Sequence, residues 1–175
     1  MSESSTAVAF TPIPSVDRMA ATSIDVAAAA PSGATAIGVP IATDGELPSA
    51  IGVGRDRLTA AGFDAQAGST LVLPGADGAT VIAVGVGNAD ALDANSVRNA
   101  AAAFARAAGA HERLAFDLSN TDAVAVDAAA QAVVEGVLLA RYRYDPLRRA
   151  PKGTPVSALT VVSPAGSMQA ATTGV

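Results

Sequence analysis

Two glycines at the end of an apolar run are the first residues whose spacing suggests chemistry. Gly85-Val86-Gly87 ends the run from residue 80 to 87 and precedes a helical pattern. Strand, glycine loop and helix follow in that order where a dinucleotide phosphate binds. However, Asp90 stands at the third glycine position, and its carboxylate would repel a phosphate. A tight exit from a strand is the favoured interpretation, and nucleotide binding at Gly85-Val86-Gly87 stays open as an alternative.

The carboxylates and the single histidine form no catalytic or metal-binding pattern. Asp117 and Asp122 flank one loop, where aspartate more often closes a turn or caps a helix. His111 follows the expected end of a helix, where a cation is favourable, and it lies in no HExxH motif. Because the chain has no cysteine, thiolate catalysis and cysteine-ligated metals are excluded. We therefore predict no catalytic, cofactor-binding or metal-binding residue in this chain.

Five of the eleven cations lie close together in the sequence, namely Arg141, Arg143, Arg148, Arg149 and Lys152. The favoured interpretation is a solvated helix C-terminus whose charges complement the helix dipole. Contact with an acidic partner, a neighbouring subunit or a polyanion is the alternative. Tyr142 and Tyr144, within the same run, are interpreted as packing anchors.

Composition and charge narrow the class of protein further. Half of the residues are hydrophobic, which excludes a disordered chain. The net charge of −5 argues against nucleic acid or an anionic membrane as a partner. No run approaches the length of a membrane span, and the first twenty residues do not have the pattern of a secretion signal. We therefore expect a cytoplasmic protein.

The elements that would position these residues alternate between strands and helices. Strands are expected at residues 23–30, 34–41, 69–73, 80–86, 114–118 and 156–162, and helices at 56–61, from Asp93 or Ser96 to Gly109, and at 123–141. Pro40 should confine its strand to a sheet edge or a strand end. Residues 69–73 and 80–86 should form an antiparallel hairpin whose second strand is central. This order predicts an α/β domain with three layers, α/β/α, and a mixed sheet over residues 21–164, after a flexible arm at 1–20.

The end of the helix at 123–141 lacks a polar face. Asp127, Gln131 and Glu135 give its first turns a polar stripe, but the residues from Val137 to Ala140 are apolar. A helix that is apolar all round is central or docks against a partner. We expect either self-association through Leu138, Leu139 and the C-terminal tail or lower burial of these leucines than of the helix start.

The run QAVVEGVLLARYRYD, residues 131–145, resembles the helix that closes the N-terminal domain of leucyl aminopeptidases. Earlier features of that family follow in the same order. GFDAQAG at 62–68 is similar to a family turn, with Ala65 in place of the usual glycine. VIAVGVGN at 81–88 and the alanine-rich helix with Arg98 are similar to the next strand and helix. The resemblance spans about residues 25–164.

The resemblance implies a macro-domain-like fold and a catalytic domain that is absent from this chain. In the family that domain binds two divalent metals, manganese or zinc, and the enzyme is a hexamer. Asn120-Thr121-Asp122-Ala123 copies the first half of the family's NTDAEGRL metal signature, but the glutamate and arginine are missing. A two-metal site needs several converging carboxylates. We therefore interpret Asp122 as a cap at, or beside, the start of the next helix and not as a metal ligand.

Three hypotheses follow. The first is a non-catalytic N-terminal domain of a leucyl aminopeptidase-like metallopeptidase, inactive alone, with residues 165–175 as a tail or the start of an interdomain linker. The second is a free-standing macro-domain-like module that binds a nucleotide or another small ligand. The third is an assembly module alone.

Overall fold

The computed structural model describes residues 21–75, 78–143 and 153–175. The expected arm at residues 1–20 lies outside the described residues, as do Tyr144, Arg148, Arg149 and Lys152. Within the described part of the chain, no helix is long and apolar enough to cross a membrane.

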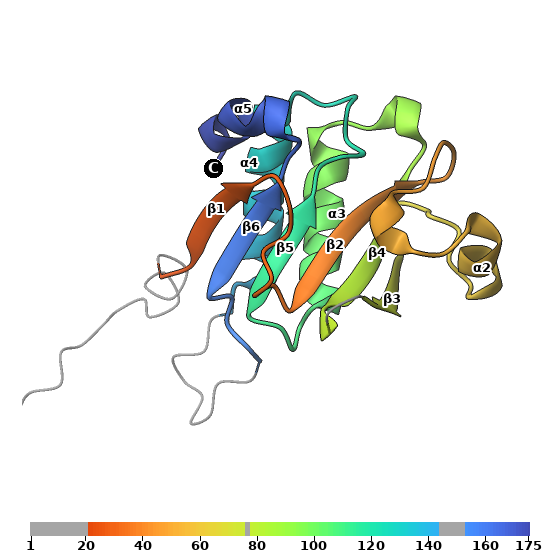
Figure 1. The fold of residues 1–175 in the computed structure, drawn as a ribbon, viewed down its shortest axis with the longest axis horizontal. Coiled ribbons are helices and arrows are strands. Elements are labelled where there is room, and N and C mark those ends of the chain that lie inside the picture. The colour runs from red at the N-terminus through yellow and green to blue at the C-terminus, as the bar shows by residue number, and fades with distance from the viewer. Residues whose placement is uncertain (1–20, 76–77, 144–152) are drawn as a thin grey trace, which may run out of the picture.

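Six strands form one mixed sheet (Figure 1). They are β1 (Ser23–Ala27), β2 (Ala36–Ala42), β3 (Thr70–Pro74), β4 (Thr80–Gly87), β5 (Arg113–Asp117) and β6 (Ala158–Val162). The spatial order is β1-β6-β5-β2-β4-β3, in which every neighbouring pair is parallel except β3 and β4. The expected hairpin is therefore confirmed. Its second strand, β4, is buried from residue 81 to residue 86, as a strand covered on both faces should be.

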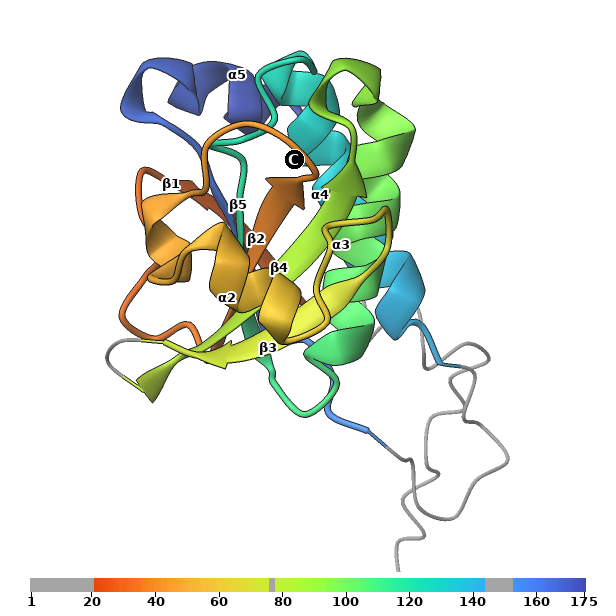
Figure 2. The same ribbon diagram turned by 90° about the vertical axis from the view of Figure 1, so that its right-hand side faces the viewer.

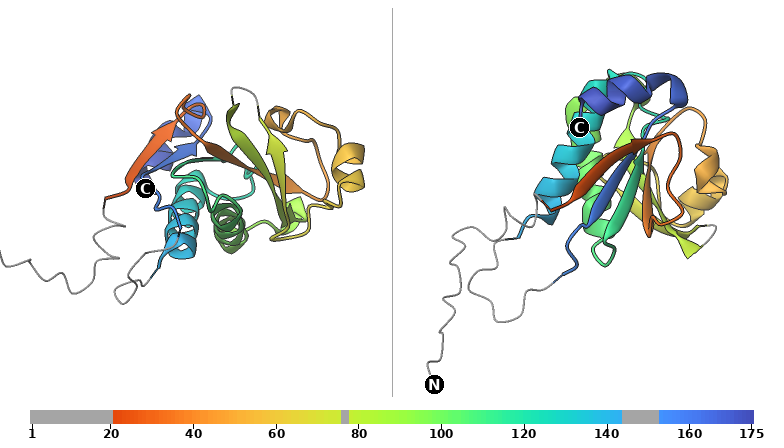
Figure 3. Two further views of the ribbon diagram at one scale, coloured as in Figure 1. Left: turned by 90° about the horizontal axis from the view of Figure 1, so that it is seen from below. Right: turned by 60° about the vertical axis from the view of Figure 1, so that its left-hand side comes forward.

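Helices cover the two faces of the sheet unequally. The α-helices are α2 (Arg55–Ala60), α3 (Ala94–Ala107), α4 (Val126–Arg141) and α5 (Met168–Thr173), with short 3-10 helices η1 (Ser49–Ile51), η3 (Ala89–Ala91) and η4 (Ala165–Ser167). The long helices α3 and α4 pack side by side on one face, and the short α2 lies on the other (Figures 2 and 3). The α/β/α class with a mixed sheet is confirmed, although the second helical layer is thin.

The larger core lies between the sheet and the pair α3 and α4. Its largest members are Phe104 of α3 and Phe116 of β5, whose rings meet edge to face with centroids 5.6 Å apart. Gly38 of β2 gives them room, since a Cβ there would lie 2.7 Å from the Phe116 ring. A smaller core under α2 contains Leu58 and Phe63. The chain has few aromatic residues, so this glycine and ring pair organise the centre of the domain.

Pro40 lies in a central strand but in its end part, so the second of the two expected positions, a strand end, is the one that the structure shows. β2 runs between β5 and β4, but the two pairings differ in length. β4 pairs along the whole of β2, whereas β5 pairs only with residues 36–38. Pro40 therefore lies in the end of β2 that has one partner strand, where a missing N–H is tolerated.

The end of α4 is less buried than its start, as one of the two expectations stated. Ala129 and Val133 are fully buried, whereas Leu138 is half-buried and Leu139 is 66% exposed. Because the expectation named either self-association or lower burial, lower burial meets it, and no self-association through these leucines is required. Residues 165–175, expected as a tail or linker, contain η4 and α5, and α5 packs against α4 and β1. There, Gly174 approaches α4 so closely that a Cβ would lie 2.0 Å from the Asp127 carbonyl oxygen.

Candidate functional site

The carboxyl ends of the parallel strands meet at one edge of the sheet. The chain leaves β2 towards α2 on one face, and it leaves the adjacent β5 towards α4 on the other. Open α/β sheets bind ligands at such a reversal of the connections. The residues that follow β2, β4 and β5 are therefore the candidate site that the fold defines.

At the end of β2, the backbone is held by Arg55 of α2. Its guanidinium donates hydrogen bonds to the carbonyl oxygens of Ala42 at 3.0 Å, Thr43 at 3.1 Å and Gly45 at 2.9 Å. The Asp44 carboxylate accepts a bond from the N–H of Ala89, which follows β4. The Arg55 guanidinium and the Asp44 carboxylate therefore form hydrogen bonds that hold the backbone after β2 and β4 in place. A small pocket under α2 is lined in part by Arg55, whose guanidinium makes these carbonyl bonds.

At the end of β5, polar side chains close turns. Asp117 accepts a hydrogen bond from the Ser119 N–H at 2.9 Å, and the buried Thr121 hydroxyl donates to the Leu118 carbonyl oxygen at 2.8 Å. The prediction that aspartate closes a turn here is confirmed for Asp117.

The prediction that Asp122 caps the following helix is wrong. Helix α4 begins at Val126, and its N-cap is Ala125, which makes no side-chain cap bond. Asp122 is exposed and lies in the turn before the helix. Asp127 instead accepts a bond from the Ala128 N–H in the first turn of α4. The helix starts later than expected because residues 118–124 form hydrogen-bonded turns, with the Val124 N–H donating to the Thr121 carbonyl oxygen.

The two glycines of Gly85-Val86-Gly87 face a turn of the same chain. The Gly85 N–H donates to the Ser69 carbonyl oxygen, and the Gly87 N–H donates to that of Ala65. A Cβ on Gly85 would lie 2.1 Å from the Gln66 carbonyl oxygen. Phosphate loops bind through unpaired backbone N–H groups, and these two are already bonded. The geometry is that of a strand exit packed against a neighbouring turn.

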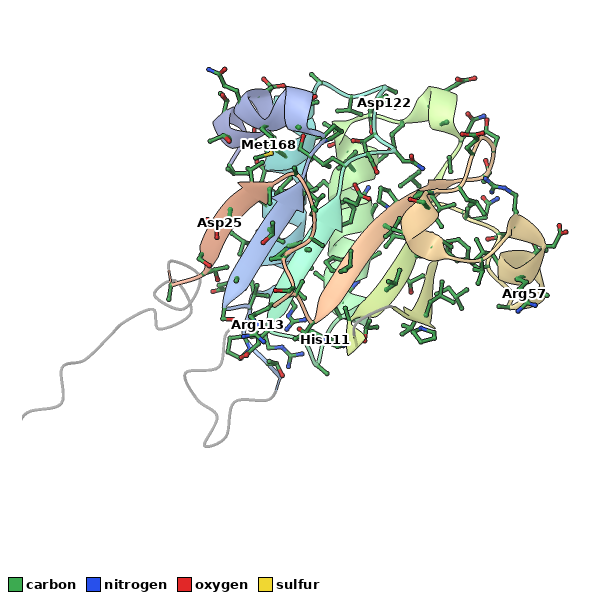
Figure 4. All side chains as sticks on the ribbon, in the orientation of Figure 1. Asp25, Arg57, His111, Arg113, Asp122 and Met168 are labelled. Carbon is green, nitrogen blue, oxygen red and sulfur yellow. The ribbon has the colours of Figure 1, made fainter. Side chains whose placement is uncertain are left out.

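His111 lies at the opposite end of the sheet from Asp122 (Figure 4). Its backbone N–H donates to the Ala108 carbonyl oxygen, just beyond the end of α3. The structure therefore separates the histidine from the carboxylates that follow the strands. Among the residues described, no three His, Asp or Glu side chains form a group that could hold a metal ion.

Arg141 differs from the solvated cation that its position predicts. Its guanidinium donates to the carbonyl oxygens of Ala105 at 3.0 Å, Ala108 at 2.7 Å and His111 at 2.9 Å, and to that of Thr154. Burial of the guanidinium, with a smaller effect from the charge of Arg143, lowers the pKa of Arg141. Arg141 thus complements the C-terminal end of α3 rather than that of its own helix. Tyr142, expected as a packing anchor, is 41% exposed.

Sequence reasoning missed two polar positions. Arg55 carried no signal, because its carbonyl partners become recognisable only when α2 folds over the end of β2. Ser163 follows β6 and is completely buried, and within the described structure its hydroxyl has no hydrogen-bond partner. Arg55 shares the lining of the small pocket under α2 with Asp64.

Comparison with solved structures defines the class of the fold. The chain is similar to the bottromycin maturation enzyme BotP, with a TM-score of 0.65 and 33% identity over 82% of this chain and 30% of that one. A second BotP structure, in complex with Mn, matches with a TM-score of 0.64 and 32% identity, covering 82% of this chain and 29% of that one. A mutant of tomato leucine aminopeptidase shares the fold, with a TM-score of 0.67 at 16% identity over 87% of this chain and 34% of that one. The chain therefore has a fold that it shares with part of BotP and with part of a leucine aminopeptidase.

The sequence comparisons make the assignment more specific. Residues 44–151 match the family model of the cytosol aminopeptidase family, N-terminal domain. A protein of Corynebacterium glutamicum named a probable cytosol aminopeptidase is 39% identical over 93 residues, which cover 53% of this chain and 17% of that protein. The chain belongs to the cytosol aminopeptidase family through its N-terminal domain. It spans less than a third of the length of the curated relative that it matches.

Proposed function

We propose that this chain is the non-catalytic N-terminal domain of a metallo-aminopeptidase that releases N-terminal amino acids from peptides. The observation that carries the proposal is the family match over residues 44–151. The internal bonding of the candidate site supports it. Asp117 binds the Ser119 N–H within its own turn, and Arg55 of α2 binds carbonyl oxygens of the loop after β2, so both side chains are already engaged in the fold.

In this proposal, the chemistry belongs to a catalytic domain of the same polypeptide. Two divalent metals, manganese or zinc, would activate water there for attack on the peptide carbonyl. The BotP structure with Mn supports the choice of metal. A cytoplasmic location and a hexamer, in which this domain contributes to assembly or regulation, complete the proposal. The name of the Corynebacterium relative supports the location.

A free-standing nucleotide-binding module is the less favoured function. It would need unpaired N–H groups at the end of β4, but those of Gly85 and Gly87 donate to carbonyl oxygens of residues 65–69. Ligand binding there would require residues 65–69 to move away from β4. That movement would break the close contact that excludes a side chain at Gly85.

The test is an activity assay on the purified chain with a chromogenic leucyl substrate and added manganese or zinc. We expect no metal-dependent turnover. The matched control is the same chain extended by a catalytic domain of this family, which should hydrolyse the substrate under the same conditions. Turnover by the 175-residue chain that persists after contaminating peptidases are removed would show that the domain itself is catalytic.

A further inference from the structure

The strand β3 forms one edge of the sheet, and its protection against pairing is confined to Pro74 at its last position. Proteins block exposed edges with charged residues, prolines, bulges or a covering element. Residues 68–75 contain no charged residue, and the pairing of β3 with β4 has no register shift. Figure 2 looks towards this edge, with β3 crossing the lower part of the domain. The opposite edge strand, β1, instead carries the exposed Asp25 at its centre.

The hydrogen bonds of the hairpin show which backbone groups of β3 point outward. The Gly85 N–H donates to the Ser69 carbonyl oxygen, and the Gly75 N–H donates to that of Ala79. In an antiparallel pair, alternate residues direct both backbone groups to the same side. Since residues 69 and 75 face β4, residues 70, 72 and 74 face away from it. The outward groups are the N–H and carbonyl of Thr70 and Val72 and the carbonyl of Pro74.

We propose that this edge pairs with β3 of a second copy of the chain, antiparallel and centred on Val72. In this register, the two Val72 residues exchange N–H and carbonyl bonds. The Thr70 N–H of each copy meets the Pro74 carbonyl of the other. The register overlaps all five residues of β3 and uses every outward N–H of the strand. Pro74 has no N–H, and this symmetric arrangement needs only its carbonyl.

The side chains favour the same partner. Val72 is 58% exposed, and its register neighbour Ile82 belongs to the core beneath α3. Pairing about Val72 would place two valines side by side and extend this apolar layer across the two copies. A β-branched pair on adjacent strands is favourable. The absence of charge along the edge removes the repulsion that two identical strands would otherwise feel.

Cysteine cross-linking provides the test, because the natural chain has no cysteine. The Cα atoms of a directly opposed, hydrogen-bonded pair lie about 5.5 Å apart, within the range of a disulfide. Val72→Cys should therefore form a covalent dimer on mild oxidation, and a reductant should reverse it. Leu139→Cys is the matched control, since Leu139 is more exposed at 66% but lies on α4. Equal cross-linking of the two variants would overturn the proposal.

Light scattering over a concentration series gives an independent readout. The wild-type mass should rise from 17.1 kDa towards twice that value. Val72→Lys should hold the mass at the monomer value, whereas Leu139→Lys should behave as the wild type. Thr70→Pro, which removes one outward N–H without touching the bonds to β4, should weaken the dimer in the same way, with unchanged circular dichroism. A wild type that stays monomeric, or dimerisation lost only in Leu139→Lys, would overturn the proposal.

Discussion

Two arginines hold loop carbonyls in this domain. Arg55 binds the loop after β2, and Arg141 joins the end of α4 to the end of α3 and to residue 154. A guanidinium suits this task because its fixed fork presents several donors at once. Both side chains therefore stabilise the positions of backbone segments.

Arg141→Ala should lower the free energy of unfolding by about 2–3 kcal/mol, since hydrogen bonds to a charged group are worth about 1.5–3 kcal/mol and this group is only partly buried. Urea denaturation measures the change. Arg57→Ala is the control, because Arg57 is exposed on α2, and its effect should stay within about 0.5 kcal/mol. Arg141→Lys should fall between them. Equal effects of the two alanine variants would mean that the carbonyl bonds contribute little.

Gly85→Ala should be strongly destabilising, by about 3 kcal/mol or more, because its Cβ would meet backbone atoms that cannot rotate away. Gly33→Ala is the matched control, since the nearest atom to its Cβ would be 3.9 Å away. The urea midpoints of the two variants provide the comparison. If Gly85→Ala lowers the urea midpoint no more than the control does, residues 65–69 move aside at little cost. Such a result would favour a ligand-binding loop at the end of β4.

At the scale of elements, α3 and α4 show where local signals suffice. Helix α3 begins directly after Asp93, one of the two caps that the sequence allowed, and Asp93 accepts bonds from the N–H and the hydroxyl of Ser96 at 2.7 and 2.8 Å. In α4 the periodicity located the helix, but its first turn was misplaced. The chain between β5 and α4 is held by Thr121 and Leu118, whose burial depends on the rest of the fold.

Asp93→Ala should lower the urea midpoint at neutral pH, whereas Asp122→Ala should leave it unchanged. The hydrogen bonds from Ser96 lower the pKa of Asp93 below its usual value of 3.8. Because the folded-state pKa lies below the unfolded value, this stabilisation is fully present above pH 3.8 and disappears as the pH falls through the folded-state pKa. The difference between wild type and Asp93→Ala should therefore shrink in acid. A reversed order of the two variants would restore Asp122 as the cap.

At the scale of the whole molecule, the net charge and the position of Arg141 affect whether the chain can bind a polyanion. The chain carries a net charge of −5, and Arg141, the first cation of the basic run, is bound to backbone carbonyls. Fewer cations are therefore available to bind a polyanion than the basic residues at 141–152 suggest.

We predict that the chain does not bind duplex DNA at physiological salt, about 0.15 M. Fluorescence anisotropy of a labelled duplex should show a dissociation constant weaker than about 0.1 mM, the weak end of non-specific binding. A basic DNA-binding domain measured in parallel confirms that the probe responds. Binding at micromolar chain that weakens with added salt would contradict the prediction and favour the polyanion interpretation of residues 141–152.

The sequence by itself determined the six strands and the two long helices in their order and the β3 and β4 hairpin, and it narrowed the cap of α3 to Asp93 or Ser96. These follow from periodicity and from contacts between residues close in the chain. Only the tertiary structure decided that β2 is central, that Gly85 meets the 65–69 turn and that Arg141 binds the end of α3. Each joins residues distant in sequence, and no local pattern encodes which distant backbone will lie against a given side chain. The open edge of β3 is of the same kind, because an edge exists only once the order of all six strands is set.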